Sequence, residues 1–238
     1  MPVDHDENDW PDRRHELGID DSLLSPDQRN GQGTPGGFHS AKIILYSVDF
    51  HDIERLQQSG DWTEAGRLLA NAARSLEIAG ADFLVLCTNT MHNVAPAIEA
   101  AVAIPLFHIA DPTAEEIKRQ RLARVGLLGT RFTMEQDFYR DRLSRVHAIE
   151  VVIPAEPDRE IVHRVIYDEL CMGQVRDESR DEYRRIIATL VDQGAQAVIL
   201  GCTEIAMLVG PADSPVPVFD TTSLHARKAA ELSMSPAR

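Results

Sequence analysis

Cysteine and long apolar runs are both scarce in this chain of 238 residues. The three cysteines, Cys87, Cys171 and Cys202, are too few for a disulfide framework and lack the paired spacing of a metal site. No apolar run approaches the roughly 20 residues that a membrane span requires, and the first residues lack the basic and apolar regions of a signal peptide. We therefore expect a cytoplasmic protein with reduced thiols.

Positively charged residues are also few compared with negatively charged ones. The chain has 24 Lys and Arg against 38 Asp and Glu, which gives a formal net charge of −14. Such a surface repels phosphate backbones and anionic lipid, so nucleic acid and membranes are excluded as partners. The nine histidines show no H-x-x-x-H spacing, and no glycine-rich phosphate loop is visible. We expect no metal site.

The first 37 residues differ from the rest of the chain. They contain nine acidic residues, four prolines and five glycines, but only seven apolar side chains without a period. This composition predicts a separate, disordered N-terminal segment over 1–37.

From residue 41 onward, short apolar runs alternate with stretches of helical periodicity. The runs have the near-continuous apolar character of parallel strands that are covered on both faces. They predict strands over 42–48, 82–86, 104–109, 125–128, 151–153, 197–200 and 216–219, and helices over 61–79, 94–102, 134–146, 160–172 and 178–193. The pattern indicates an α/β fold.

Two stretches of the chain are alike. G-A-D-F-L-V-L-C-T-N-T (80–90) and G-A-Q-A-V-I-L-G-C-T-E (194–204) each have a helix end, an apolar strand and then Cys-Thr with a polar residue. Because ligands of open α/β sheets bind at the carboxyl ends of strands, the repeat predicts two related lobes that each deliver a cysteine to a shared cleft.

These residues also carry a family resemblance. C-T-N-T-M-H (87–92) and G-C-T-E (201–204) resemble the paired signatures of the aspartate/glutamate racemase family, and the similarity extends over roughly 38–232. The resemblance implies two pseudo-symmetric α/β lobes, 38–115 with 216–238 and 116–215, with an amino-acid substrate between them. It also implies proton exchange at Cα by two thiols on opposite faces, without a cofactor, in a homodimer.

The residue types suit this chemistry. A Cα proton is a poor acid, so its removal needs a strong base and donors for the charge that builds on the carboxylate. We expect a helix N-terminus to lower the pKa of Cys202. Pyridoxal phosphate would need a Schiff-base lysine, and neither motif contains one of the three lysines, which favours a route without a cofactor.

One departure from the family pattern concerns the first thiol. In the family a cysteine directly precedes Asn-Thr, whereas here Thr88 holds that place and Cys87 comes one residue earlier. Side chains alternate along a strand, so Cys87 and Thr88 are expected on opposite faces. We expect Cys202 to act as the base and Thr88 as a proton donor or relay, with Cys87 buried as a small apolar residue. Cys171 is expected in the core or at the surface.

The remaining polar residues of the motifs have weaker predictions. By resemblance, Asn89, Thr90 and Thr203 bind the substrate α-carboxylate. Glu204 and His92 either lie near the thiols or serve as cap and surface groups. Thr130 and Thr133 either donate to the substrate or cap the helix that begins near residue 134.

Family members begin with a strand and a glycine-rich turn that this chain lacks. Codons permitted for 5–35, read one base later, can encode that signature, I-G-L-I-G-G-M-S-W-E-S-T. We therefore hypothesise that residues 1 to about 35 are an out-of-frame reading, with a single-base insertion or deletion just before Gly36. Two alternatives to a racemase stay open: a one-thiol decarboxylase or isomerase of the same superfamily, and a non-catalytic amino-acid-binding protein.

Overall fold

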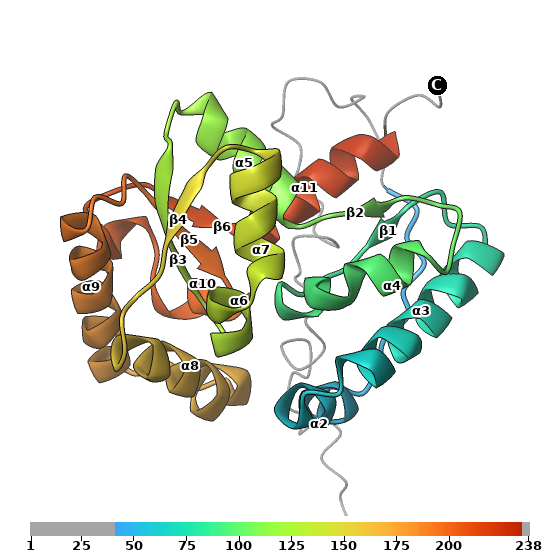
Figure 1. Cartoon of the computed structure of the whole chain (residues 1–238), viewed down its shortest axis with the longest axis horizontal. Helices are drawn as coiled ribbons and strands as arrows, with labels where there is room; N and C mark the ends of the chain where they lie inside the picture. The colour runs from blue at the N-terminus through green and yellow to red at the C-terminus, as the bar shows by residue number, and fades with distance from the viewer. Residues whose placement is uncertain (1–40, 235–238) are drawn as a thin grey trace, which may run out of the picture.

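A computed structural model describes residues 41–234, and its strands form two separate parallel sheets (Figure 1). The prediction for 1–37 lies outside the described residues. The smaller sheet pairs β1 with β2, and the larger has the order β4-β3-β5-β6, with every pairing parallel. The strands are β1 (Leu84–Val85), β2 (Leu106–Phe107), β3 (Arg124–Gly129), β4 (Glu150–Val152), β5 (Val198–Gly201) and β6 (Val218–Asp220). The predicted α/β class with two parallel sheets is confirmed.

The helices lie between and around these strands. The longer ones are α2 (Phe50–Ser59), α3 (Trp62–Ile78), α5 (Ala110–Arg119), α8 (Asp158–Asp168), α9 (Asp177–Asp192) and α11 (Thr221–Met234). Shorter ones are η1 (Thr90–Val94), α4 (Ala95–Glu99), α6 (Arg131–Glu135), α7 (Asp137–Asp141), η2 (Arg142–Val146), η3 (Leu170–Met172), α10 (Ile205–Leu208) and η4 (Pro211–Asp213). Within the described residues, no helix combines the length and the apolar character needed to cross a membrane.

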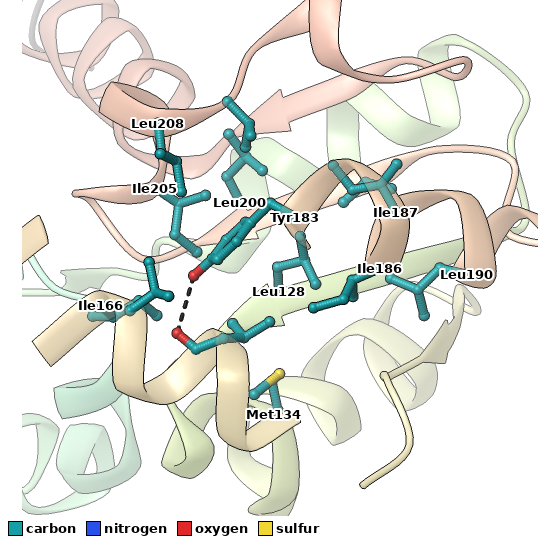
Figure 2. Packing of buried hydrophobic residues seen from close by; sticks show 14 of the residues in the cluster. Leu128, Met134, Ile166, Tyr183, Ile186, Ile187, Leu190, Leu200, Ile205 and Leu208 are labelled. Carbon is teal, nitrogen blue, oxygen red and sulfur yellow. Dashed lines mark hydrogen bonds between the residues drawn. The ribbon is translucent and has the colours of Figure 1, made fainter. Parts of the chain in front are cut away.

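Successive side chains of the central strands enter opposite halves of the core. Leu128 and Leu200 pack with α8 and α9 in one cluster, whereas Leu127 and Ile199 pack with α5 and Phe219 in another. Figure 2 shows the first cluster, in which the buried Tyr183 hydroxyl donates to the Val162 carbonyl at 3.0 Å. Helices on both faces explain why β3 and β5 have continuous apolar runs.

The smaller sheet has a core of its own. Its centre combines Ile53 of α2, Leu69 of α3, Leu84 of β1 and Ile98 of α4. The turn between α2 and α3 is set by Gly60, which has a φ of 71°, and by the Asp61 side chain, which accepts a hydrogen bond from the first turn of α3. These helices and strands form the right half of the molecule in Figure 1.

The prediction of a strand over 42–48 is wrong, because this segment has no regular secondary structure and belongs to neither sheet. Ile43, Ile44, Leu45 and Tyr46 are each 45–58% exposed, so neither of the two alternating faces is covered. A strand exists only where a neighbour supplies a ladder of hydrogen bonds. Among the described residues β1 pairs only with β2, and the segment therefore has no partner.

Other differences are smaller. The helix predicted over 134–146 is divided into α6, α7 and η2, and the one predicted over 94–102 is reduced to α4. The sequence patterns did not predict α2, α5, α10 and α11. β6 pairs with β5 in the larger sheet, although 216–238 was assigned to the first lobe. The lobe boundaries themselves stay a prediction.

Candidate active site

At the end of β5 the chain passes so close to β3 that only glycine fits at position 201. A Cβ atom on Gly201 would lie 2.8 Å from Leu127 Cδ1 and 2.9 Å from the Leu128 carbonyl oxygen of β3. Such contacts leave no room for a side chain. The close approach of β3 and β5 fixes the position from which the chain turns, and Cys202 is the first residue after the strand.

Cys202 is paired with a carboxylate. Its thiol donates to Glu204 Oε2 over 2.9 Å, within the turn between β5 and α10. Burial raises the pKa of the thiol well above its ordinary value, and the negative charge of Glu204 raises it further. The expectation of a lowered pKa is therefore wrong, because these two effects outweigh the N-terminus of the short helix α10. The thiol keeps its proton, and that proton already points at an acceptor.

The first motif does not lie on a strand. β1 ends at Val85, and the Thr88 amide donates to the Leu86 carbonyl at 2.9 Å, which bends the chain at this point. The expected alternation of Cys87 and Thr88 rested on strand geometry, so it does not decide which way they face. Both residues are half-buried, and the Cys87 thiol lies 3.8 Å from the Val85 carbonyl oxygen.

His92 holds the bend that contains Thr88. The Ile109 amide, which can only donate, lies 3.2 Å from His92 Nε2, and the Thr88 carbonyl, which can only accept, lies 2.7 Å from Nδ1. The network therefore assigns the proton to Nδ1. Burial lowers the pKa of His92 well below its usual range, so the ring is neutral. Of the two alternatives for His92, the structure excludes a surface position, because the ring is buried.

Three buried threonine hydroxyls connect the segment after β1 with the segment after β3. Thr90 Oγ1 lies 2.9 Å from Thr130 Oγ1 and 3.2 Å from Thr133 Oγ1, and the latter two are 3.2 Å apart. Thr130 also caps α6, since it accepts from the Thr133 amide. We call these three residues the threonine triangle. Its hydroxyl protons can be redirected to a ligand, because each hydroxyl both donates and accepts.

Asn89 is linked to the larger sheet through the first residue of α11. Its side-chain amide donates to Thr221 Oγ1 at 3.0 Å, and Thr221 donates to the Leu200 carbonyl at 2.9 Å. Asn89 is 2% exposed, and its Oδ1 atom has no partner among the described residues. Buried acceptors are nearly always satisfied, so this oxygen is available to a bound donor. Thr221 was not among the predicted site residues, although it ends the stretch V-F-D-T (218–221) that comprises β6 and the start of α11.

The other predicted residues occupy the same region. Thr203 is half-buried in the turn between Cys202 and Glu204. Cys171 in η3 packs against the cluster that also contacts Cys202, and burial raises its pKa to about 12. The structure thus brings the first motif to the segment after β3 through the contact of Thr90 with Thr130, and to β5, just before the second motif, through Asn89, Thr221 and the Leu200 carbonyl.

The profile of the family described as Asp/Glu/hydantoin racemase matches residues 32–229. The chain belongs to this family. It is 60% identical to a candidate Asp/Glu racemase from Yersinia pestis whose crystal structure is known, with a TM-score of 0.78, and the match covers 84% of this chain and 87% of the other.

Two further relatives of this Asp/Glu/hydantoin racemase family member are informative. An aspartate racemase homologue from Pyrococcus horikoshii OT3 is 36% identical over 81% of this chain and 83% of its own, with a TM-score of 0.70. The broad specificity amino-acid racemase RacX of Bacillus subtilis is 25% identical over 70% of this chain and 71% of its own length. The family resemblance and the fold class are therefore both confirmed.

Proposed function

We propose that this protein racemises a polar α-amino acid, of the aspartate or glutamate type, without a cofactor. The observation that carries the proposal is the thiol of Cys202 hydrogen-bonded to the Glu204 carboxylate at the end of β5. Family membership supports the reaction class, and the names of the relatives support amino acids as substrates.

In the proposed reaction, the hydroxyls of the threonine triangle and Thr203 and the second Nδ2 proton of Asn89 donate to the α-carboxylate, and Asn89 Oδ1 accepts from the substrate ammonium group. The Cys202 proton passes to Glu204, and the resulting thiolate removes the Cα proton on one face of the substrate. Hydrogen bonds to the carboxylate stabilise the negative charge that develops on it. On the other face Cα receives a proton from a hydroxyl group, which water reprotonates. The protonated Glu204 then gives its proton to the hydroxide that remains, so that the site returns to its starting state.

Thr88 is proposed to deliver that proton. By resemblance it occupies the place of the first catalytic cysteine, and His92 fixes its backbone carbonyl. A hydroxyl is a far weaker acid than a thiol, so the two faces should differ in rate. We also propose that the protein is a homodimer, as the family resemblance implies. Sedimentation velocity measures this oligomeric state.

The test is deuterium incorporation at Cα in heavy water, followed by NMR for L- and D-amino acids. We expect exchange with the full chain and a loss of at least about 10²-fold in Cys202→Ala, as is usual for a lost catalytic base. Cys171→Ala, which removes a thiol from the same hydrophobic cluster, is the matched control and should keep exchange. Release of carbon dioxide would indicate a decarboxylase, and binding without exchange a non-catalytic protein.

A further inference from the structure

Three buried histidines gather next to the bend that contains Thr88. They are His92 of η1, His108 directly after β2, and His225 of α11. The ring centroids of His92 and His108 are 4.2 Å apart, and those of His92 and His225 are 6.3 Å apart. We call these three residues the histidine cluster. Three segments that are far apart in the sequence therefore meet around the ring of His92.

The backbone of Thr88 is held on both sides. Its amide donates to the Leu86 carbonyl at 2.9 Å, and its carbonyl accepts from His92 Nδ1 at 2.7 Å. The backbone amide of His92 also donates to the Asn89 carbonyl at 3.1 Å. One residue thus binds the carbonyls of two consecutive site residues, and it fixes the backbone that carries the Thr88 hydroxyl.

The other two histidines fix the orientation of the His92 ring. The Ile109 amide lies 3.2 Å from His92 Nε2, which makes Nε2 the acceptor and leaves the proton on Nδ1. The segment around Ile109 is bound on both sides, because the first amide of α5 donates to His108 Nδ1 at 3.1 Å and His225 Nε2 donates to the last carbonyl of β2 at 2.9 Å. His108 and His225 therefore place the amide that selects the tautomer of His92.

The histidine cluster is uncharged near neutral pH. Burial lowers the pKa of His92 well below its usual range, that of His108 to about 3 and that of His225 to about 4. The positive charge of Arg142 also lowers the pKa of His92 and His108. A neutral imidazole has one donor and one acceptor, which is the combination that the two backbone groups beside His92 require.

We propose that the histidine cluster positions the Thr88 hydroxyl, and that His92 thereby controls inversion at Cα without a part in the proton removal by Cys202. The inference rests on the proposed racemase function and assigns the residues that support its second face. In it the Nδ1 proton of His92 stays on the Thr88 carbonyl and never reaches the substrate. Displacement of a reacting group by about 1 Å can cost about 10²-fold in rate, so the loss of this hydrogen bond should slow proton delivery from Thr88.

Inversion and exchange with retention report on the two faces separately. After Cys202 has removed the Cα proton, its thiol exchanges with heavy water and can return deuterium to the same face, which gives retention. Delivery from Thr88 to the other face gives inversion. NMR for deuterium at Cα and chiral chromatography measure both rates in one sample of aspartate or glutamate. A change that displaces Thr88 alone lowers the ratio of inversion to retention, whereas general damage to the fold lowers both rates together.

Two substitutions at position 92 form a matched pair. The side-chain nitrogen of Asn can replace Nδ1 of His, because both are bonded to Cγ, whereas the longer side chain of Gln has no nitrogen at that place. We expect His92→Gln to lower the ratio at least about tenfold with KM unchanged, and His92→Asn to keep it within about threefold. His163→Gln, at a buried histidine of α8 whose Nδ1 accepts from the Arg131 amide at 3.2 Å, is the control and should keep the ratio.

An unchanged ratio in folded His92→Gln overturns the inference, and so does a ratio in His92→Asn that falls as far as in His92→Gln. If the variants do not fold, nitrogen NMR of the wild type decides: the His92 proton should lie on Nδ1, and a proton on Nε2 overturns the inference. Failure of the inference is separable from failure of the proposed function. In the first case the wild type inverts an amino acid and His92→Gln keeps the ratio, and in the second the wild type neither exchanges nor inverts any amino acid.

Discussion

Replacing Glu204 by Gln separates the two effects of this carboxylate on Cys202. The Sγ and Oε2 atoms are 2.9 Å apart, and the substitution keeps an acceptor oxygen while removing the charge. Two unit charges about 4 Å apart interact by about 4 kcal/mol at an effective dielectric constant of about 20, and solvent screening of the partly exposed Glu204 reduces this repulsion. Removing the charge should therefore lower the pKa of Cys202.

The rate of Cα exchange should nevertheless fall. Without a carboxylate to receive the thiol proton, Cα exchange should fall about 10²-fold even though the thiolate forms more readily. The assay is alkylation of Cys202 by iodoacetamide across pH, followed by peptide mass spectrometry, alongside deuterium exchange. Glu178→Gln, an exposed residue of α9, is the matched control. Faster exchange together with faster alkylation would refute the role of Glu204 as proton acceptor.

Three further predictions concern other parts of the molecule. Cys87→Ala should keep most of the Cα exchange, and a loss equal to that of Cys202→Ala would show that two thiols operate. Burial lowers the pKa of His108 to about 3 and that of His225 to about 4. Below about pH 6.5 the unfolded chain binds more protons than the folded one, so the free energy of unfolding should fall by about 2 kcal/mol per histidine between pH 7 and pH 5. An equal thermal midpoint at the two pH values would contradict this prediction. In a chain whose residues 1–35 are translated in the alternative frame, the backbone amides of 42–48 should be protected from hydrogen exchange. Unchanged protection would disprove the frame hypothesis. So would codons for Arg13, Arg14 and Leu17 that cannot encode Gly, Gly and Trp one base later.

The central strands of the larger sheet could be predicted from the sequence, because strands that are covered on both faces have nearly continuous apolar runs. The runs that contain Leu127 and Ile199 are apolar without interruption, and both became central strands. The run of 42–48 is also rich in apolar residues, but a strand needs a neighbouring strand as well, and composition does not reveal whether one is present. Helix α5 was missed because its buried face consists largely of Ala110, Pro112, Thr113 and Ala114, which give a weak apolar period.

The structure brings several of the predicted site residues into contact, whereas their electrostatics could not be predicted from the sequence. The motifs located Cys202, and the structure places Thr90 with Thr130 and Thr133 as one group of hydroxyls. The raised pKa of Cys202 follows from burial and from the Glu204 charge, which depend on the turn after β5. The contact of Asn89 with Thr221 joins residues 132 positions apart, and no local pattern encodes it.

The central claim is an asymmetric site with a thiol on one face of the substrate and the Thr88 hydroxyl on the other. The most direct measurement is the ratio of initial Cα exchange rates for the D- and L-enantiomers in the wild type and in Thr88→Cys. The account predicts unequal rates in the wild type, and a rise in exchange from the D-enantiomer when the second thiol is introduced, because a thiol is a far stronger acid than a hydroxyl. An unchanged or lower D-to-L ratio in folded Thr88→Cys would contradict it and remove position 88 from the proton path.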